Sequence, residues 1–284
     1  MRVLVLGAGG MAGHVVSIYL REKGHEVIGF SKTPLSYCNS SIVGDALDKR
    51  VLEEAVTCQP YDAVINCIGV LNKEVDHHMA DGIFLNSYLP HYIADCLQDT
   101  KTKLIHLSTD CVFSGKTGGY SEESFKDSKS FYGITKSLGE INDTKNLTIR
   151  TSIIGPDSKE NGVGLLNWFL IQKEQVNGFT SAIWTGISTI TLAQAIEYAI
   201  EADLCGLYHL VNNETISKYK LLQLFNRYIR KEQVDIIPVD SAQVDKSLVN
   251  HRKDFEFKVP SYEQMIKDTE QWIHAHKELY PHYF

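Results

Sequence analysis

The first thirteen residues of the chain, MRVLVLGAGGMAG, constrain its fold more than any other stretch. A short apolar run is followed by glycines at three spaced positions, Gly7, Gly10 and Gly13. This pattern predicts a buried β-strand that turns tightly into a helix, because glycines permit both the turn and the close approach of helix to strand. It also leaves room for a pyrophosphate at the start of the helix, where backbone N–H groups and the helix dipole favour negative charge.

Apolar segments of strand length alternate with segments of helical periodicity over the first half of the chain. After the opening strand, the sequence predicts helices at 12–23, 49–57, 81–97 and 131–143, and strands at 26–30, 61–68, 103–107 and 147–154. Such alternation is typical of a parallel sheet with helices on both faces. We therefore predict an α/β fold with a Rossmann-type, doubly wound parallel sheet.

The alternation ends at Gly155-Pro156, and the pattern beyond this point is less regular. We expect a dinucleotide-binding domain with the catalytic residues over 1–155, and a smaller α/β substrate-capping lobe over 156–284 that leaves part of the chain free to return to the sheet. Within the second half, the periodicity predicts helices at 163–175, 192–202, 218–231 and 261–277, and strands near 187 and at 206–211.

Composition excludes several classes of function. The net charge of −7 argues against a dedicated nucleic-acid binder, since affinity for phosphate backbones comes from clustered Lys and Arg. No apolar run approaches the roughly 18 residues that a membrane-spanning helix needs. The six cysteines form no CxxC motif and no Cys/His pair of metal-ligand spacing. We therefore expect a cytoplasmic protein with reduced thiols, without a metal site and without a membrane partner.

The end of the second predicted strand bears on the choice of dinucleotide. In a dinucleotide-binding fold this strand ends at the adenosine ribose, where an NAD-preferring protein usually carries Asp or Glu. Here the chain has Ser31 and Lys32. A carboxylate would repel a 2′-phosphate, whereas a hydroxyl and an ammonium would bind it. The sequence therefore favours NADP(H) as the cofactor.

A second strong signal lies in the helix that follows the predicted loop 114–130. Tyr132 and Lys136 are four residues apart, which places both on one face of the helix. A phenol has an unperturbed pKa of about 10, and a nearby ammonium lowers that pKa toward the working range of an acid–base catalyst. Thr109 follows a predicted strand at its carboxyl end, where open α/β sheets bind ligands. Its hydroxyl could polarise a substrate carbonyl beside the phenol.

Taken together, these motifs resemble the extended short-chain dehydrogenase/reductases, and most of all the dTDP-4-dehydrorhamnose reductase branch. The resemblance covers the whole chain and is weaker after Gly155. It is carried by the three spaced glycines, by Tyr132-x-x-x-Lys136, and by the segments Asn66–Gly69, Ser108–Gly115, Gly119–Glu122, Gly139-Glu140, Arg150–Ser152 and Gly206–Leu210.

The resemblance implies an enzyme that reduces the C4 keto group of a nucleotide-activated 4-keto-6-deoxyhexose with NADPH, for surface polysaccharide precursors. Tyr132 would protonate the alkoxide, Thr109 would hold the carbonyl oxygen, and Lys136 would tune Tyr132 and anchor the ribose. Asn86 would support the adjoining structure or a proton-relay water. A homodimer is one option, since helices that flank the sheet commonly pair in this superfamily.

Beside the three catalytic candidates, further residues are expected to bind the cofactor or the substrate. The expected cofactor site comprises Gly7, Gly10, Met11, Ala12, Ser31, Lys32, Asp45, Cys67, Ile68, Gly69, Asn86, Tyr132 and Lys136. The expected substrate pocket comprises Asp110, Cys111, Asn167, Trp168, Trp184 and Arg252.

The residues that follow Thr109 help to distinguish between the reactions that members of the same family catalyse. Nucleotide-sugar dehydratases resemble this fold but carry Asp-Glu there, whereas this chain has Asp110 and Cys111. The reductase branch usually has Tyr at the cysteine position, and an Arg-Pro pair where Val244-Asp245 stand. A UDP-linked 2-acetamido-2,6-dideoxy-4-hexulose therefore competes with the dTDP-linked substrate. A nucleotide-sugar epimerase and a non-enzymatic NADP-binding regulatory subunit are the alternatives from other functional classes.

Overall fold

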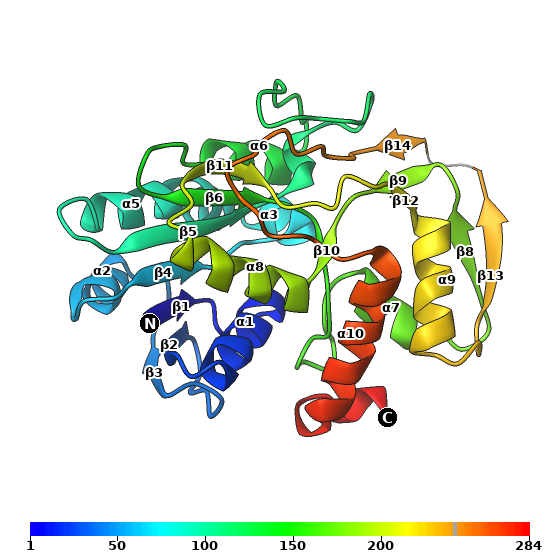
Figure 1. The fold of residues 1–284 in the computed structure, drawn as a ribbon, viewed down its shortest axis with the longest axis horizontal. Helices are drawn as coiled ribbons and strands as arrows, with labels where there is room; N and C mark the ends of the chain where they lie inside the picture. The colour runs from blue at the N-terminus through cyan, green and yellow to red at the C-terminus, as the bar shows by residue number, and fades with distance from the viewer. Residues whose placement is uncertain (241–242) are drawn as a thin grey trace.

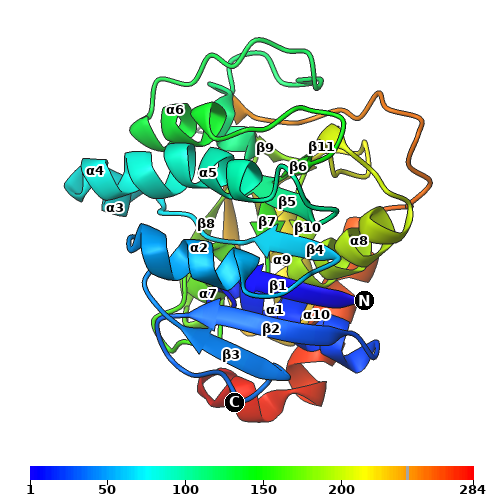
Figure 2. The same ribbon diagram turned by 90° about the vertical axis from the view of Figure 1, so that its left-hand side faces the viewer.

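The computed structural model describes residues 1–240 and 243–284 and contains a seven-stranded parallel sheet, as the sequence predicts. Its strands follow the order β11-β6-β5-β4-β1-β2-β3, and Figure 2 shows them in this succession. Every neighbouring pair in it is parallel. The strands are β1 (Arg2–Leu6), β2 (Glu26–Ser31), β3 (Ser40–Val43), β4 (Ala63–Asn66), β5 (Lys103–Ser108), β6 (Leu147–Arg150) and β11 (Gly206–His209).

Helices cover both faces of this sheet (Figures 1 and 2). Side chains alternate along β1, so that Val3 and Val5 enter one apolar core while Leu4 and Leu6 enter the other. The first core includes residues of α1 (Met11–Glu22) and α8 (Thr189–Glu201), which contact each other. The second core includes residues of α2 (Lys49–Thr57) and α5 (Leu89–Cys96). The remaining helices of the sheet region are α3 (Asn72–His77), α4 (Met79–Ile83), the π-helical turn η1 (Phe84–Tyr88) and α6 (Phe131–Leu138).

A group of short strands and helices from the second half of the chain lies beside the sheet, on the right in Figure 1. β8 (Gln175–Phe179) pairs in parallel with β13 (Asp235–Val239). β9 (Ala182–Trp184) pairs with β12 (Ile216–Ser217) and with β14 (Val244–Asp245). The helices there are α7 (Leu165–Leu170), α9 (Lys218–Tyr228) and α10 (Tyr262–Ala275), and short 3₁₀ turns follow at Lys277–Leu279 and Pro281–Tyr283.

Several expected elements differ from the observed ones. The single strand expected at 147–154 is divided, because the chain leaves the main sheet after Arg150 and β7 (Ile153–Ile154) pairs instead with β10 (Ile187–Ser188). The helix expected at 163–175 stops at Leu170, whose carbonyl oxygen accepts a hydrogen bond from Arg230, and β8 then begins at Gln175.

The second half of the chain also contributes to the main sheet. β11 forms its edge beside β6, and α8 packs on α1. Both elements lie after residue 155. The division into a domain of residues 1–155 and a lobe of residues 156–284 stays a prediction, with these two elements as the part of the second segment that returns to the sheet.

The turn between β1 and α1 depends on two of its glycines. Gly7 has a φ of +75°, a conformation that side chains disfavour. At Gly13, a Cβ atom would lie 2.2 Å from the Gly7 carbonyl oxygen, so only glycine lets the helix approach the turn this closely. At Gly9, by contrast, the nearest atom to a Cβ would be 3.6 Å away, which is ordinary contact.

Gly13→Ala should therefore destabilise the fold, and Gly9→Ala is its matched control in the same turn. We expect Gly13→Ala to lower the free energy of unfolding by about 1–3 kcal/mol, the usual cost of overpacking a tight site. Gly9→Ala should stay within about 0.5 kcal/mol of the wild type. Urea unfolding followed by circular dichroism measures both. Equal stability of the two variants would contradict the packing argument.

Candidate active site

The proposed catalytic residues meet at the carboxyl ends of β4 and β5, beside the start of α6. Thr109 directly follows β5 and is buried. Its hydroxyl accepts a hydrogen bond from the Cys111 N–H and donates one to the Asp110 carboxylate, both at 3.1 Å. These bonds hold the 3₁₀ turn η2 (Asp110–Val112) against the end of the strand. Thr109 also lies close enough to Tyr132 to influence the pKa of its phenol.

Helix α6 carries Tyr132 and Lys136 and is positioned by close backbone contacts. Its N-terminus is capped by the Ser130 hydroxyl, which accepts a hydrogen bond from the Gly133 N–H. A Cβ atom at Gly133 would lie 2.1 Å from the Cys111 carbonyl oxygen. One at Gly139 would lie 2.0 Å from the Asn86 carbonyl oxygen in η1. The two glycines thus let α6 touch the turn after Thr109 at one end and η1 at the other.

Lys136 is buried, and its ammonium group points toward β5. Its Nζ donates a hydrogen bond of 2.6 Å to the Leu107 carbonyl oxygen and lies 3.4 Å from Nε2 of His106. Burial lowers the pKa of Lys136 to about 8, while the nearby Glu140 carboxylate opposes the shift. Lys136 is therefore a cation that gives up its proton far more readily than a surface lysine does.

The pKa of Tyr132 differs from the expectation drawn from the sequence. Burial raises it above the ordinary value of a phenol, the neighbouring Cys111 raises it further, and Thr109 opposes these effects. Lys136, expected from the sequence to lower this pKa, is not among the groups that shift it, and the cost of burying a phenolate dominates. The free protein therefore keeps Tyr132 as a neutral phenol, which is a proton donor.

Both polar atoms of the Asn86 side chain have partners near the site. Its Oδ1 accepts a hydrogen bond from the Val70 N–H, and its Nδ2 donates one to the Val70 carbonyl oxygen, both at 2.9 Å. The same Nδ2 lies 3.2 Å from the Thr135 hydroxyl. Of the two roles expected for Asn86, these contacts match support of the adjoining structure, because its amide already has partners on both sides.

The start of α1 lies next to the segment that follows β4. The N-terminus of α1 has the features of a phosphate-binding turn. Helix α1 has no side-chain cap and no acidic residue in its first turn. Within residues 1–240 and 243–284, no acceptor is paired with the backbone N–H groups of Met11 and Ala12. A Cβ at Gly7 would lie 3.0 Å from Ile68 Cγ1, and one at Gly69 would lie 3.9 Å from Lys136 Nζ. The glycine turn and the proposed catalytic lysine thus border the same segment.

Beyond the carboxyl end of β2, Lys32 forms an ion pair with Asp45, 3.0 Å from Nζ to Oδ2. Both belong to the expected cofactor site, but the sequence did not show that they face each other. A hollow of about 410 Å³ opens beside Lys32 and is lined also by Leu47, Val70 and Leu85. A larger hollow, about 480 Å³, lies between α1, α8 and α10 and contains none of the expected site residues.

The residues expected to line the substrate pocket fall into two groups. Asp110 and Cys111 adjoin Tyr132, and burial raises the pKa of both side chains. Trp184 and Asn167 have structural partners instead. Trp184 is buried and donates to the Ser152 hydroxyl, and the Asn167 side chain donates to the Gly155 and Val163 carbonyl oxygens and accepts from Tyr283. Trp168 is 43% exposed on α7.

Arg252 is also placed away from the proposed reacting groups. Its guanidinium pairs with Asp254 and donates to the carbonyl oxygens of Cys205 and Leu207, at the start of β11. The proposed catalytic residues lie at the carboxyl ends of the strands, which is the opposite end of the sheet. The structure therefore does not bring Arg252 together with Asp110 and Cys111, because its partners hold it at the start of β11.

The segment that follows β14 runs along the loop after Thr109, which the sequence did not reveal (Figure 1). The Gly115 carbonyl oxygen accepts a hydrogen bond from the Asp245 N–H, and Tyr120 forms a bridge with Leu248. Lys246 lies close enough to Asp110 and Cys111 to influence their pKa values. A side chain more than a hundred residues away in sequence thus reaches the candidate site.

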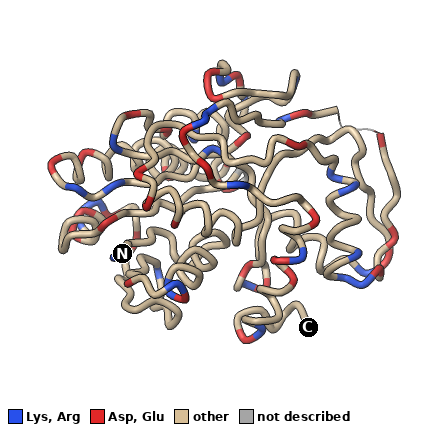
Figure 3. The backbone as a smooth tube through the Cα atoms, in the orientation of Figure 1, with Lys and Arg blue, Asp and Glu red and all other residues tan. Residues whose placement is uncertain are grey.

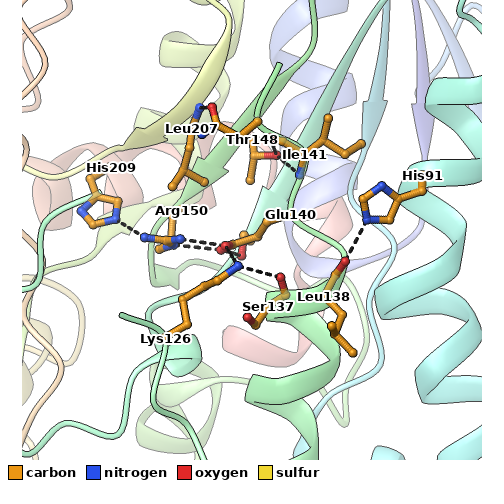
Figure 4. A network of polar contacts seen from close by, with 12 residues as sticks. His91, Lys126, Ser137, Leu138, Glu140, Ile141, Thr148, Arg150, Leu207 and His209 are labelled. Carbon is orange, nitrogen blue, oxygen red and sulfur yellow. Dashed lines mark hydrogen bonds and ion pairs between the residues drawn. The ribbon is translucent and has the colours of Figure 1, made fainter. Parts of the chain in front are cut away.

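A buried ion-pair network fixes the end of α6 to the sheet (Figure 4). In the sequence, Glu140 and Arg150 stand only among the residues that carry the family resemblance, and nothing there predicts that they pair. Arg150 on β6 donates two hydrogen bonds to the Glu140 carboxylate, at 2.8 and 2.7 Å. Ser108 on β5 donates to the same carboxylate at 2.6 Å, and Lys126 pairs with it from the surface. His209 accepts from Arg150 at 2.7 Å. Arg150 lowers the pKa of Glu140 despite its burial.

The described residues contain neither a metal-binding group nor a membrane-spanning helix. In the part of the chain that the structure describes, no group of three His, Cys, Asp or Glu side chains could hold a metal ion. Across the same residues, no helix is both long and apolar enough to cross a membrane. Figure 3 shows Lys and Arg interspersed with Asp and Glu along the backbone.

Removing the charge of Glu140 should test the network. Glu140→Gln leaves the Arg150 guanidinium buried without a counterion, and we expect a loss of about 3–5 kcal/mol in the free energy of unfolding at pH 7. Because the folded pKa of Glu140 is depressed, its stabilising contribution is present above the unfolded pKa and is lost as the pH falls through the folded pKa. The difference between variant and wild type should therefore narrow below about pH 4.3.

Lys126→Ala is the matched control, because Lys126 contacts the same carboxylate from a partly exposed position. We expect this variant to cost at most about 1 kcal/mol. Urea unfolding at several pH values measures all three proteins. A loss in Glu140→Gln as small as that in Lys126→Ala would show that the buried pair does not hold α6.

Comparison with known proteins gives one consistent picture. "Spore coat polysaccharide biosynthesis protein SpsK" of Bacillus subtilis is 28% identical over 226 residues, which cover 77% of this chain and 76% of that protein. "Probable low-salt glycan biosynthesis reductase Agl14" of Haloferax volcanii is 28% identical over 230 residues, covering 76% of each.

Among solved structures, a dTDP-4-dehydrorhamnose reductase of Bacillus anthracis in complex with NADP superposes with a TM-score of 0.80 at 21% identity. The match covers 96% of this chain and 99% of that one. The model of the RmlD substrate binding domain matches residues 1–273. The chain therefore belongs to the RmlD substrate binding domain family.

Proposed function

We propose that this protein is an NADPH-dependent reductase of the C4 keto group of a nucleotide-activated 4-keto-6-deoxyhexose, acting in the synthesis of surface polysaccharide precursors. The observation that carries the proposal is the convergence of Thr109, Tyr132 and Lys136 at the sheet edge that the α1 N-terminus also borders. Membership of the RmlD family and the reductase names of similar proteins support it.

The residues at the start of α1 fit a dinucleotide. The N–H groups of Met11 and Ala12 would hold the pyrophosphate, since no acidic side chain opposes an anion there. Ser31 and Lys32 would hold the 2′-phosphate of the adenosine, beside the hollow at the end of β2. When bound, NADPH supplies the hydride. All other steps of the proposed reaction belong to side chains of this chain.

The proposed roles follow from the protonation of the site. Thr109 would orient the carbonyl oxygen of the substrate by a hydrogen bond. Tyr132, a neutral phenol in the free protein, would donate its proton to that oxygen as negative charge develops. The ammonium of Lys136 would stabilise the phenolate left behind and bind the ribose. Elimination of water lacks its usual acid–base pair, because Cys111 stands where the dehydratases carry Glu.

The nucleotide and the C2 substituent of the sugar are not fixed by these residues. Cys111 adjoins Tyr132 where the reductase branch usually carries a larger side chain. We therefore keep two substrates, a dTDP-linked 4-keto-6-deoxyhexose and a UDP-linked 2-acetamido-2,6-dideoxy-4-hexulose. Oxidation of NADPH with either one, followed by NMR of the product, distinguishes them. Tightly retained NAD would favour an epimerase, and binding of NADP without turnover of any substrate would favour a regulatory subunit.

A homodimer stays a prediction of the family resemblance. Large apolar side chains are exposed on neighbouring helices of the sheet region, among them Ile83, Tyr88, Phe131, Ile134 and Leu138. They lie on α4, η1 and α6, which contact one another. A second copy could cover this face, and a monomeric mass in sedimentation equilibrium would contradict the prediction.

Tyr132→Phe tests the reaction. The variant lacks the proton donor but keeps the ring, so we expect turnover to fall by at least about 100-fold, while NADPH binds nearly as well as to the wild type. Tyr88→Phe is the matched control, because Tyr88 is exposed on η1 and outside the proposed site. NADPH absorbance follows turnover, and calorimetry follows binding. Full activity of Tyr132→Phe would exclude the proposed mechanism.

Lys32→Ala tests the choice of cofactor. Loss of the ammonium should weaken binding of NADPH by about tenfold, the effect of roughly 1.4 kcal/mol. Binding of NADH should hardly change, because it has no 2′-phosphate, and it serves as the control within each protein. Calorimetric dissociation constants for both cofactors measure the effect. An equal change for NADPH and NADH would show that Lys32 does not recognise the phosphate.

A further inference from the structure

A buried polar chain lies on the side of Lys136 that faces the sheet, and the proposed mechanism does not use it. Asn66 on β4 and His106 on β5 are directly paired in the sheet register, and both are fully buried. Nδ2 of Asn66 lies 3.2 Å from Nδ1 of His106, and Nε2 of His106 lies 3.4 Å from Nζ of Lys136. The chain thus runs from β4 through β5 to the proposed catalytic helix.

The direction of these hydrogen bonds is set at the Asn66 end. The Ile68 N–H donates to Oδ1 of Asn66 at 3.0 Å, which turns the amide nitrogen toward His106. An amide nitrogen can only donate, so Nδ1 of His106 accepts. Burial keeps His106 neutral by lowering its pKa well below the ordinary value. A neutral imidazole that accepts at Nδ1 carries its proton at Nε2.

This proton faces Lys136. The lysine Nζ already donates to the Leu107 carbonyl oxygen, and an ammonium has only donors to offer. An ammonium beside the Nε2–H would place two donors against each other, whereas an amine could accept from it. We propose that Asn66 and His106 are positioning residues that fix the Nε2–H tautomer of His106 and so favour loss of a proton from Lys136.

Other groups around Lys136 do not account for this effect. Glu140, on the same helix, is paired with Arg150, and its charge favours the ammonium. Cys67, which follows β4, likewise acts to raise the pKa of the lysine. His91 on α5 lies near His106 and donates a hydrogen bond to the Leu138 carbonyl oxygen, and its charge would disfavour a charged His106. Burial and the Nε2–H of His106 therefore act together against Glu140 and Cys67, which both favour the ammonium of Lys136.

Asn66→Asp should reverse the arrangement with almost no change in shape. The carboxylate can still accept from the Ile68 N–H, but it would also accept from Nδ1 of His106. The imidazole proton would then move to Nδ1, and Nε2 would accept from the Lys136 ammonium. We expect the pKa of Lys136 to rise by about one unit or more.

The test uses NMR of the full chain labelled with ¹⁵N-histidine and with ¹³C,¹⁵N-lysine. Long-range ¹H–¹⁵N correlations identify the tautomer of His106, assigned by its absence in His106→Gln. A pH titration of the lysine signals, assigned with Lys136→Arg, gives the pKa of Lys136. We expect the Nε2–H form in the wild type and the Nδ1–H form with a higher lysine pKa in Asn66→Asp.

Three outcomes would overturn the proposal. They are an Nδ1–H or charged His106 in the wild type at neutral pH, an unchanged tautomer in Asn66→Asp, and a flipped tautomer without a rise in the lysine pKa. The first measurement does not need Asn66→Asp, so misfolding of that variant leaves the proposal testable. A rise in the lysine pKa without a flip would reflect the added charge alone.

The role of Asn66 and His106 in catalysis rests on the proposed function, and the kcat profile tests it separately from the NMR measurement. If the protein is a reductase whose activity needs the Lys136 ammonium, Asn66→Asp should extend the alkaline limb of the kcat profile upward by the same shift that NMR reports. Absence of any turnover would count against the proposed function and would leave the NMR result standing. A matching NMR shift with an unmoved kcat profile would show that this lysine does not limit turnover.

Discussion

The candidate site depends on one interaction, the buried pair between Glu140 and Arg150. Arg150 lies on β6 and Glu140 follows α6, so the pair joins the helix that carries Tyr132 and Lys136 to the interior of the sheet. Ser108 adds a bond from β5, directly before Thr109. A pair buried this deeply adds little net stability by itself, but loss of either partner leaves an uncompensated charge. Its value here is geometric, because it keeps the phenol, the ammonium and the threonine hydroxyl in one frame.

Much of the main sheet could be predicted because its signals are local. The apolar run before Gly7 and the repeated strand–helix alternation identify β1, β2, β4 and β5 without knowledge of any long-range contact. Elements that depend on partners far away in sequence were harder. The strand β11 was predicted at 206–211, but its pairing with β6 at the edge of the sheet had no local signal, and neither did the break after Arg150 that sends β7 to pair with β10. Both depend on pairing that only the folded chain supplies.

The same distinction holds for the site. Tyr132 and Lys136 could be placed on one face from their spacing alone, and Thr109 from its position after a strand. Their protonation could not be predicted, because it depends on burial: the sequence suggested a phenol activated by a cation, whereas the structure holds a neutral phenol. Arg252 looked suitable by charge, yet its partners Cys205 and Asp254 hold it at the other end of the sheet. Charge in a sequence does not show where the charge is used.

Burial acts on the two proposed catalytic groups in complementary directions. It raises the pKa of Tyr132 and lowers that of Lys136 to about 8, so the phenol holds its proton firmly and the ammonium holds its own loosely. A site that must give a proton to an alkoxide and then recover it benefits from both. The phenol remains a donor until charge develops on the substrate, and a lysine that releases its proton easily can help to restore the phenol afterwards. After Lys136 releases its proton, the neutral amine still has a hydrogen-bond partner, because the Nε2–H of His106 can donate to its lone pair.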